Sequence, residues 1–310
     1  MAAAGYSYFS MGSMADYEAM AAKSREALAK DFSLRELVRH AALAANSHNT
    51  QSWKFAASQN GIRILPDFTR RTPVVDPDDH HLFASLGCAA ENLVLAAAAR
   101  GRAADVVFGD QIDVSFTTAA PVESDLFSAI TARQCTRSVY DGADIAADQL
   151  RLLEEAARME GVDVLLITDK AKREQALEAI LAANSAQLGD AGFRKELIGW
   201  MRFNPASAMA EGDGLFSACS GNPTLPSWLA NFILPLALTA DAENKKYTEQ
   251  VRSSAGLAVF VSAKDDREHW FKAGRAYERF ALKATALGIR NAFVNQPVEV
   301  ASMRGDFAKS

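Results

Sequence analysis

The segment Ser47–Trp53, "SHNTQSW", gathers small hydrogen-bonding side chains that suit a grip on a polar ligand. Ser47, Asn49 and Gln51 supply a hydroxyl and two amides, and amide side chains both donate and accept hydrogen bonds. The His48 ring contacts the same ligand or fills the space beside it. Trp53 follows at the start of an extended pattern, which favours core packing for its indole.

A second segment, "RQCTRSVY", begins at Arg133. Arg133 and Arg137 stand four residues apart, and the thiol of Cys135 and the hydroxyl of Thr136 lie between them. Guanidinium groups and hydroxyls are the donors that a phosphate dianion prefers. Taken alone the pattern is weak, because such clusters also occur at solvated helix ends.

Two adjacent histidines, His80 and His81, follow the aspartates Asp76, Asp78 and Asp79 and suggest a metal site. Adjacent histidines do not easily face one ion, and the loop lacks regular ligand spacing. We therefore interpret this segment as a solvated acidic turn and predict no metal.

Composition excludes several classes of protein. The 33 lysines and arginines are scattered among 38 acidic residues, with a net charge of -5, so no basic field attracts nucleic acid. No apolar run is long enough to cross a membrane without interruption. Three widely spaced cysteines indicate a reducing compartment. The start, "MAAAGYSYFSMG", lacks the features of an export signal, so we expect a cytoplasmic protein; a trimmed remnant of such a signal is the alternative.

Hydrophobic periodicity predicts the elements that position these segments. Helical spacing runs from Leu34 to Ala45 and leads directly into "SHNTQSW". Further elements are expected as a strand pair at 53–57 and 62–65, helices at 82–100 and 145–160, strands in "VDVLLI" and "LAVFV", and a helix in "HWFKAGRAYERFALKATALG".

Two of the predicted helices match each other at a constant offset, which indicates an internal duplication. The matching pairs are Gly87 with Gly274, Glu91 with Glu278, Leu95 with Leu282 and Gly101 with Gly288. The alternative is a chance match of two alanine-rich core helices.

Together the two polar segments give the chain a resemblance to the FMN-dependent nitroreductase superfamily, in which an R-R-S-x-R motif and an S-x-x-N-x-Q-P-W motif occur. Here Cys135 replaces the usual serine of the first motif, and Ser52 replaces the proline of the second. Within the superfamily the chain is similar to fused, flavin-sequestering proteins of dormancy and stress responses. This likeness is carried by "HNTQ", "SLGCAAENLVLAAAARG", "GWMRF" and "DGL" and spans roughly residues 30 to 300.

The order of the motifs is reversed relative to ordinary members, because the arginine motif follows the amide motif. Family members are homodimers with flavin at the interface, so the reversed order favours a fused pseudo-dimer with one complete site. We expect an α+β fold in which two degenerate repeats carry central mixed sheets flanked by long helices. The predicted divisions are an N-terminal arm (1–30), a first repeat (31–125) and a second repeat (126–310) with a lid insertion at about 204–235.

The resemblance implies one FMN per chain, bound through eight residues: Ser47, His48, Asn49, Gln51, Arg133, Cys135, Thr136 and Arg137. It also implies backbone amides at the start of the following helix as phosphate donors, and no catalytic side chain. The predicted function is electron transfer from NAD(P)H through FMN to a nitroaromatic, quinone or similar small-molecule acceptor, by a monomeric pseudo-dimer or a homodimer. Two alternatives are an FMN storage protein with a closed lid, and an interaction protein that has lost the site.

Overall fold

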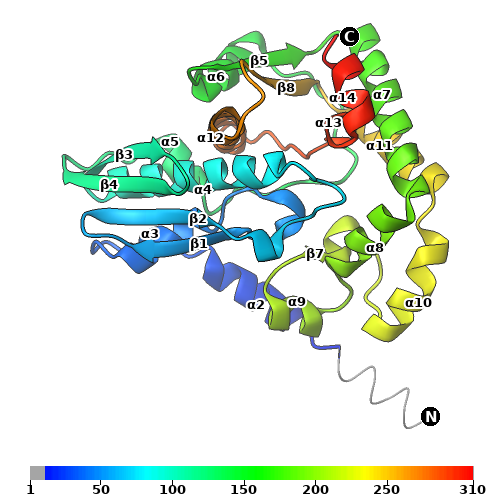
Figure 1. Ribbon diagram of the computed structural model, residues 1–310, viewed down its shortest axis with the longest axis horizontal. Helices are drawn as coiled ribbons and strands as arrows, with labels where there is room; N and C mark the ends of the chain where they lie inside the picture. The colour runs from blue at the N-terminus through cyan, green and yellow to red at the C-terminus, as the bar shows by residue number, and fades with distance from the viewer. Residues whose placement is uncertain (1–10, 310) are drawn as a thin grey trace.

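The computed structural model describes residues 11–309, so the first ten residues of the predicted arm lie outside it. Two long helices, α4 (His80–Ala99) and α12 (Arg267–Ala286), pack side by side at the centre. A four-stranded sheet lies on one side of this pair and a two-stranded sheet on the other (Figure 1). Both helices are long and rich in alanine, which allows close approach and leaves their buried faces to form the core.

The first half of the chain builds the larger sheet. Its strand order is β1-β2-β4-β3, and all of its neighbours are antiparallel. Gly61 lies where β2 meets β4, and a Cβ there would stand 1.9 Å from the carbonyl oxygen of Val114, so no side chain fits. The elements of this half are α2 (Met14–Ser24), α3 (Leu34–Ala41), η1 (Ser47–Asn49), β1 (Trp53–Ala57), β2 (Gly61–Pro66), η2 (Phe68–Arg70), α4, β3 (Arg102–Phe108), β4 (Ile112–Thr118) and α5 (Asp125–Ala129).

The second half repeats the order helix, strand, strand, helix, with α6, β5, β8 and α12 in place of α3, β1, β2 and α4. Strands β5 and β8 pair antiparallel. The bounds are α6 (Ala147–Ala157), β5 (Val162–Ile167), β8 (Leu257–Ser262) and α12, followed by α13 (Gln296–Glu299) and α14 (Ala301–Phe307).

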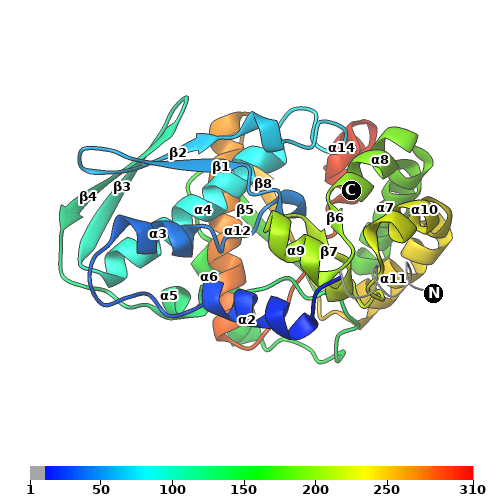
Figure 2. The same cartoon turned by 90° about the horizontal axis from the view of Figure 1, so that it is seen from below.

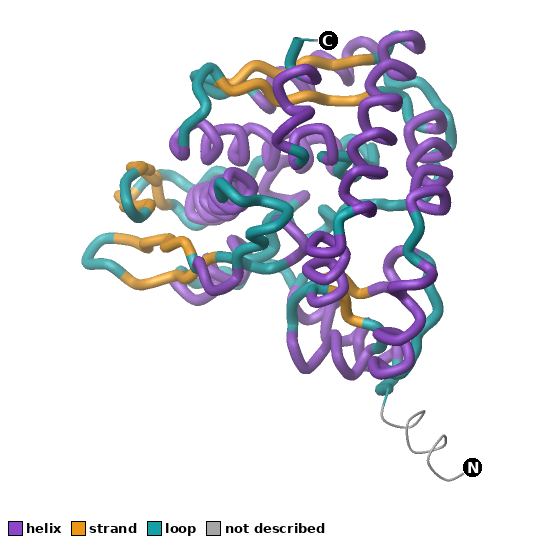
Figure 3. The backbone as a smooth tube through the Cα atoms, turned by 45° about the vertical axis from the view of Figure 1, so that its right-hand side comes forward, coloured by secondary structure: helices purple, strands orange, loops and turns teal. Residues whose placement is uncertain are grey.

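Between β5 and β8 the chain inserts residues 168–256, which we call the insertion. The insertion is mostly helical and carries one short parallel strand pair, β6–β7 (Figure 3). It lies at the opposite end of the molecule from the four-stranded sheet (Figure 2). Its elements are α7 (Lys170–Gly189), α8 (Ala191–Gly199), β6 (Met201–Arg202), α9 (Pro205–Glu211), β7 (Leu215–Phe216), η3 (Ser217–Ser220), α10 (Ser227–Ala237) and α11 (Ala240–Ser253).

The two central helices touch through the paired glycines that the sequence match singled out. A Cβ on Gly87 would stand 2.0 Å from the carbonyl oxygen of Phe271, and one on Gly274 would stand 1.8 Å from that of Ala84. The contacts are reciprocal, since Ala84 and Phe271 occupy equivalent positions in the two helices. Each helix therefore uses the same patch to contact the other, as the two subunits of an isologous dimer do.

Most of the predicted elements are confirmed, including both long helices and the strand pair predicted at 53–57 and 62–65, which the structure has at 53–57 and 61–66. Trp53 is 7% exposed and belongs to the core, as predicted. The expectation of central mixed sheets is wrong. The two larger sheets are purely antiparallel and lie outside a central helix pair, because the buried alanine and glycine faces of α4 and α12 pack against each other.

Helix α4 is also the one helix among residues 11–309 that is long and apolar enough to cross a bilayer by length and composition. Here 78% of that stretch is buried inside the protein, as for the core helix of a folded domain.

Candidate functional site

The polar segment after α3 forms a tight loop with a strained backbone. His48, Asn49 and Gln51 have φ values of 47°, 53° and 52°. Residues other than glycine adopt the left-handed region infrequently, and clusters of such residues mark functional loops. The amide of Gln51 donates to Oδ1 of Asn46 at 2.9 Å, and the amide of Trp53 donates to the Gln51 carbonyl at 2.7 Å. The buried Trp53 ring thus anchors the loop to the sheet.

The two amide side chains of this loop contact the insertion. Nδ2 of Asn49 donates to the carbonyl oxygen of Gly214 at 3.0 Å, and Nε2 of Gln51 donates to that of Gly212 at 2.6 Å. The backbone amide of Gly214 donates a hydrogen bond to the Asn49 carbonyl at 3.0 Å. In this conformation the amides that were predicted to grip a ligand hold residues 212–214 instead.

A buried carboxylate strengthens the same contact. Asp213 is 9% exposed and pairs with Arg70 from the first half and with Arg202 from β6, whose Nε lies 3.2 Å from Oδ1. Arg70 also donates from Nε to the carbonyl of Thr50. This Asp213 clamp was not predicted from the sequence, although "DGL" was noted as part of the resemblance.

The first arginine of the second segment is part of the core. Arg133 is 6% exposed; its Nε lies 3.1 Å from Oε1 of Glu278, and its Nη2 donates to the Leu43 carbonyl at 2.8 Å. Burial alone would lower its pKa, but the Glu278 carboxylate raises it. Oε2 of Glu278 in turn accepts from the amide of Ala45 at 3.2 Å. Arg133 therefore fixes the chain that leads into the polar loop, and it is not free to bind a phosphate.

The rest of the second segment runs along the chain that follows α12. Cys135 pairs with Asn291 in a parallel bridge, and the amide of Thr136 donates to the Asn291 carbonyl at 2.9 Å. Arg137 is exposed and makes no hydrogen bond or ion pair with any other described residue. The expected amides of a following helix start are absent here, since residues 138–146 form a loop before α6 begins at Ala147.

The two predicted segments converge on His48. Burial lowers the pKa of this imidazole, the carboxylate of Glu299 opposes that effect, and the nearby charges of His81 and Arg137 lower the pKa further. Arg137 also affects Tyr247 of α11. Burial, Glu243 and Glu299 raise the pKa of Tyr247 to about 12, and the charge of Arg137 opposes this increase. The amide loop, Arg137 and two elements of the second half thus border one region.

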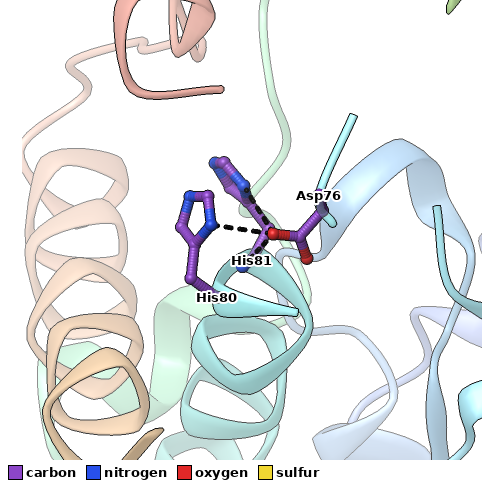
Figure 4. A group of neighbouring side chains, drawn as sticks. All are labelled: Asp76, His80 and His81. Carbon is purple, nitrogen blue, oxygen red and sulfur yellow. Dashed lines mark hydrogen bonds and ion pairs between the residues drawn. The ribbon is translucent and has the colours of Figure 1, made fainter. Parts of the chain in front are cut away.

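The histidines at the start of α4 lie beside His48 and are largely buried. Asp76 is 2% exposed and caps the helix by accepting from the amides of His81 at 3.1 Å and Leu82 at 3.0 Å. Its Oδ1 lies 2.8 Å from Nδ1 of His80, and both rings face it (Figure 4). Burial alone would raise the pKa of Asp76, but the two histidines hold it well below its usual range. The prediction of a solvated turn is wrong, because this carboxylate closes the end of a core helix.

Comparisons with known proteins agree with the resemblance to nitroreductases. No family model matches the chain. Two proteins of Mycobacterium tuberculosis, one from strain CDC 1551 and one from strain H37Rv, are 25% identical over 287 residues. Each match covers 87% of this chain and 78% of the relative, and both relatives carry the provisional name NAD(P)H nitroreductase. The likeness supports a nitroreductase-like oxidoreductase.

Proposed function

We propose that the protein is an FMN-binding oxidoreductase of the nitroreductase kind, which passes electrons from NAD(P)H to a small nitroaromatic, quinone or similar acceptor. The main support is the convergence of the strained amide loop and Arg137 on His48. An unpaired guanidinium beside a polar loop suits a phosphorylated cofactor, because the phosphate requires a positive charge and hydrogen-bond donors.

The residues present fit FMN, with other roles for Asn49, Gln51 and Arg133. Arg137 neutralises the phosphate, and Thr136 adds its hydroxyl. Ser47 and His48 hold polar groups of the cofactor; Oγ of Ser47 lies 3.3 Å from Nδ1 of His48. A lowered pKa keeps His48 neutral at pH 7, so its ring offers one donor and one acceptor. When bound, FMN supplies the redox chemistry, and the protein supplies orientation and charge.

Arg133 acts in this proposal through position and not through contact with phosphate. Its pair with Glu278 and its bond to the Leu43 carbonyl hold α12 against the segment that leads into the loop. This keeps Ser47 and His48 in place against the second half of the chain.

The fused pseudo-dimer also belongs to the proposal, with the first repeat at 31–125 and the second at 126–310. It is supported by the reciprocal contacts of Gly87 and Gly274 and by the repeated order of helix, strand, strand and helix. The equivalent Glu91 and Glu278 are both fully buried, and each pairs with arginine.

Flavin storage is a second candidate, favoured by the contacts of residues 212–214. Asn49 and Gln51 hold the backbone of the insertion, and Asp213 clamps it with two arginines. An insertion held in this way restricts access of an acceptor, so bound flavin need not turn over.

The test is to purify the protein, record its visible spectrum and then add NADPH under anaerobic conditions. The proposed enzyme is yellow, and NADPH bleaches it on the timescale of turnover. A yellow protein that NADPH does not bleach supports storage. Folded material that stays colourless after incubation with FMN contradicts both.

A further inference from the structure

A compact set of nitrogen and carboxylate donors stands at the first turn of α4, beside the candidate flavin site. Nδ1 of His80 lies 2.8 Å from Oδ1 of Asp76 and 2.7 Å from Oδ1 of Asp78. Nδ1 of His81 lies 3.5 Å from the same oxygen of Asp76. Figure 4 shows both rings turned toward the Asp76 carboxylate, and the donor atoms of Asp76, His80 and His81 all lie within 4.8 Å of one another.

These separations are compatible with those of ligand atoms around one ion. With bonds of about 2.0–2.2 Å to histidine and carboxylate, tetrahedral ligand atoms stand about 3.3 Å apart. The 3.5 Å separation is close to that spacing, whereas the 2.7 and 2.8 Å separations are those of hydrogen bonds and would lengthen when an ion replaces the proton. The adjacent positions of His80 and His81 do not prevent this, because both rings present Nδ1 to the same carboxylate oxygen.

Two buried ring nitrogens of the group, Nε2 of His80 and Nδ1 of His81, have no hydrogen-bond partner among the described residues. A buried polar atom without a partner is unfavourable, so a ligand that engages it has a direct stabilising effect.

The second ring nitrogen of His81 lies near an amide and a carboxylate of the second half. Nε2 of His81 lies 4.0 Å from Oε1 of Glu299 and 3.3 Å from Nδ2 of Asn295. Glu299 is held by Nε2 of Gln187 at 2.7 Å. Histidine ligands commonly donate from their second nitrogen to a carboxylate. Here the Glu299 carboxylate is within reach of a charge interaction but beyond hydrogen-bond distance, and Nδ2 of Asn295 is itself a donor.

The local charge also suits a dication. Asp76, Asp78 and Glu299 carry three negative charges, and Arg304 offsets one of them through its 2.8 Å pair with Asp78. We propose that Asp76, Asp78, His80 and His81 bind one divalent transition-metal ion, for which Zn²⁺ is the appropriate probe. A mixed set of imidazole and carboxylate ligands favours such ions over Mg²⁺ or Ca²⁺.

The ion would have a structural consequence. Asp76 and the histidines belong to the start of α4, whereas Glu299 and Arg304 belong to α13 and α14. A bound ion therefore stabilises the start of α4, next to His48, at the place where α13 and α14 contact it.

The experiment uses the full chain after dialysis against EDTA, with flavin content recorded separately so that the result does not depend on the proposed redox function. Zn²⁺ is titrated by calorimetry, Co²⁺ is titrated by visible absorption, and Mg²⁺ serves as the comparison ion. We expect one equivalent of Zn²⁺, ligand-field bands with Co²⁺, a higher Tm with Zn²⁺ and no comparable effect of Mg²⁺.

The variant His81→Gln removes one ligand and is expected to weaken Zn²⁺ binding at least tenfold. Its matched control is His269→Gln at the start of α12, where a buried histidine pairs with the helix-capping Asp266 at 2.7 Å, outside this group. A second variant, Arg304→Gln, removes the competing positive charge and is expected to bind Zn²⁺ several-fold more tightly.

The proposal is overturned if the parent protein binds no stoichiometric Zn²⁺. It is equally overturned if His81→Gln binds Zn²⁺ as tightly as the control does. If His81→Gln does not fold, an unchanged affinity in Arg304→Gln overturns it instead.

Discussion

Gly87 and Gly274 face each other where α4 crosses α12, and neither position has space for a Cβ. Each lies against the backbone of the opposite helix, at equivalent positions of two matched segments. This contact joins the two halves of the chain at the centre of the molecule.

Gly274→Ala should destabilise the protein, because the new methyl would stand 1.8 Å from the Ala84 carbonyl oxygen. Overpacking of this kind costs about 1–3 kcal/mol or more, and here the obstacle is backbone. Urea unfolding measures the change in the free energy of unfolding. Gly189→Ala, at the end of α7 with no atom within 4 Å, is the control and should be nearly neutral. Equal effects of the two changes would contradict the close helix crossing.

Substitution of Arg133 should lower stability, whereas substitution of Arg137 should lower FMN affinity. Arg133→Met leaves Glu278 buried without its partner and should destabilise the fold by about 3–5 kcal/mol. Arg137→Ala should leave the unfolding free energy nearly unchanged and weaken FMN binding by about 1–3 kcal/mol. Unfolding curves and flavin titrations separate the two effects. A normal flavin affinity in Arg137→Ala would exclude its phosphate role.

Asp213→Asn should loosen the contact between the insertion and the polar loop, because it removes the carboxylate charge that holds Arg70 and Arg202. Amide hydrogen exchange at residues 47–51 and 212–214 should accelerate by at least tenfold relative to the parent protein. Arg252→Gln, which breaks an exposed pair with Glu174, is the control and should leave these amides unaffected. Unchanged exchange in Asp213→Asn would show that the bonds of Asn49 and Gln51 hold the insertion without the carboxylate.

Without added metal, His80 should make stability depend on pH. Burial lowers its pKa, but Asp76 and Asp78 outweigh that effect and raise it above the ordinary 6.5, against opposition from Arg304. A raised folded-state pKa contributes stability that is complete below 6.5 and is lost as the pH rises through the folded value. His80→Gln should therefore destabilise the protein more at pH 6 than at pH 9 when unfolding is measured in EDTA. An equal loss at both values would show that the fold does not raise the pKa of His80.

Local patterns predicted the elements well, because their causes are local. The alternation at 53–57 and 61–66 and the helical spacing of α4 and α12 each depend on neighbours in sequence. The matched glycines predicted a duplication, and the structure places them where the two helices meet. The strand pairing was misjudged as mixed, since sheet topology depends on contacts that no single segment contains.

The candidate site was only partly predictable for the same reason. Arg133 and Arg137 look alike in sequence, and only the fold places Glu278 beside the first and leaves the second exposed. The Asp213 clamp joins Arg70 and Arg202, which no local motif connects. The left-handed backbone of His48, Asn49 and Gln51 likewise follows from how the loop is held at both ends.

The position of the insertion has a consequence for how the chain is made. Joining β5 to β8 closes a loop roughly thirtyfold longer than the β1–β2 hairpin, an entropic difference of about 3 kcal/mol before the insertion folds. During synthesis α4 emerges from the ribosome well before α12, which begins only at Arg267. The glycine-bearing face of α4 therefore stays uncovered until α12 has been synthesised.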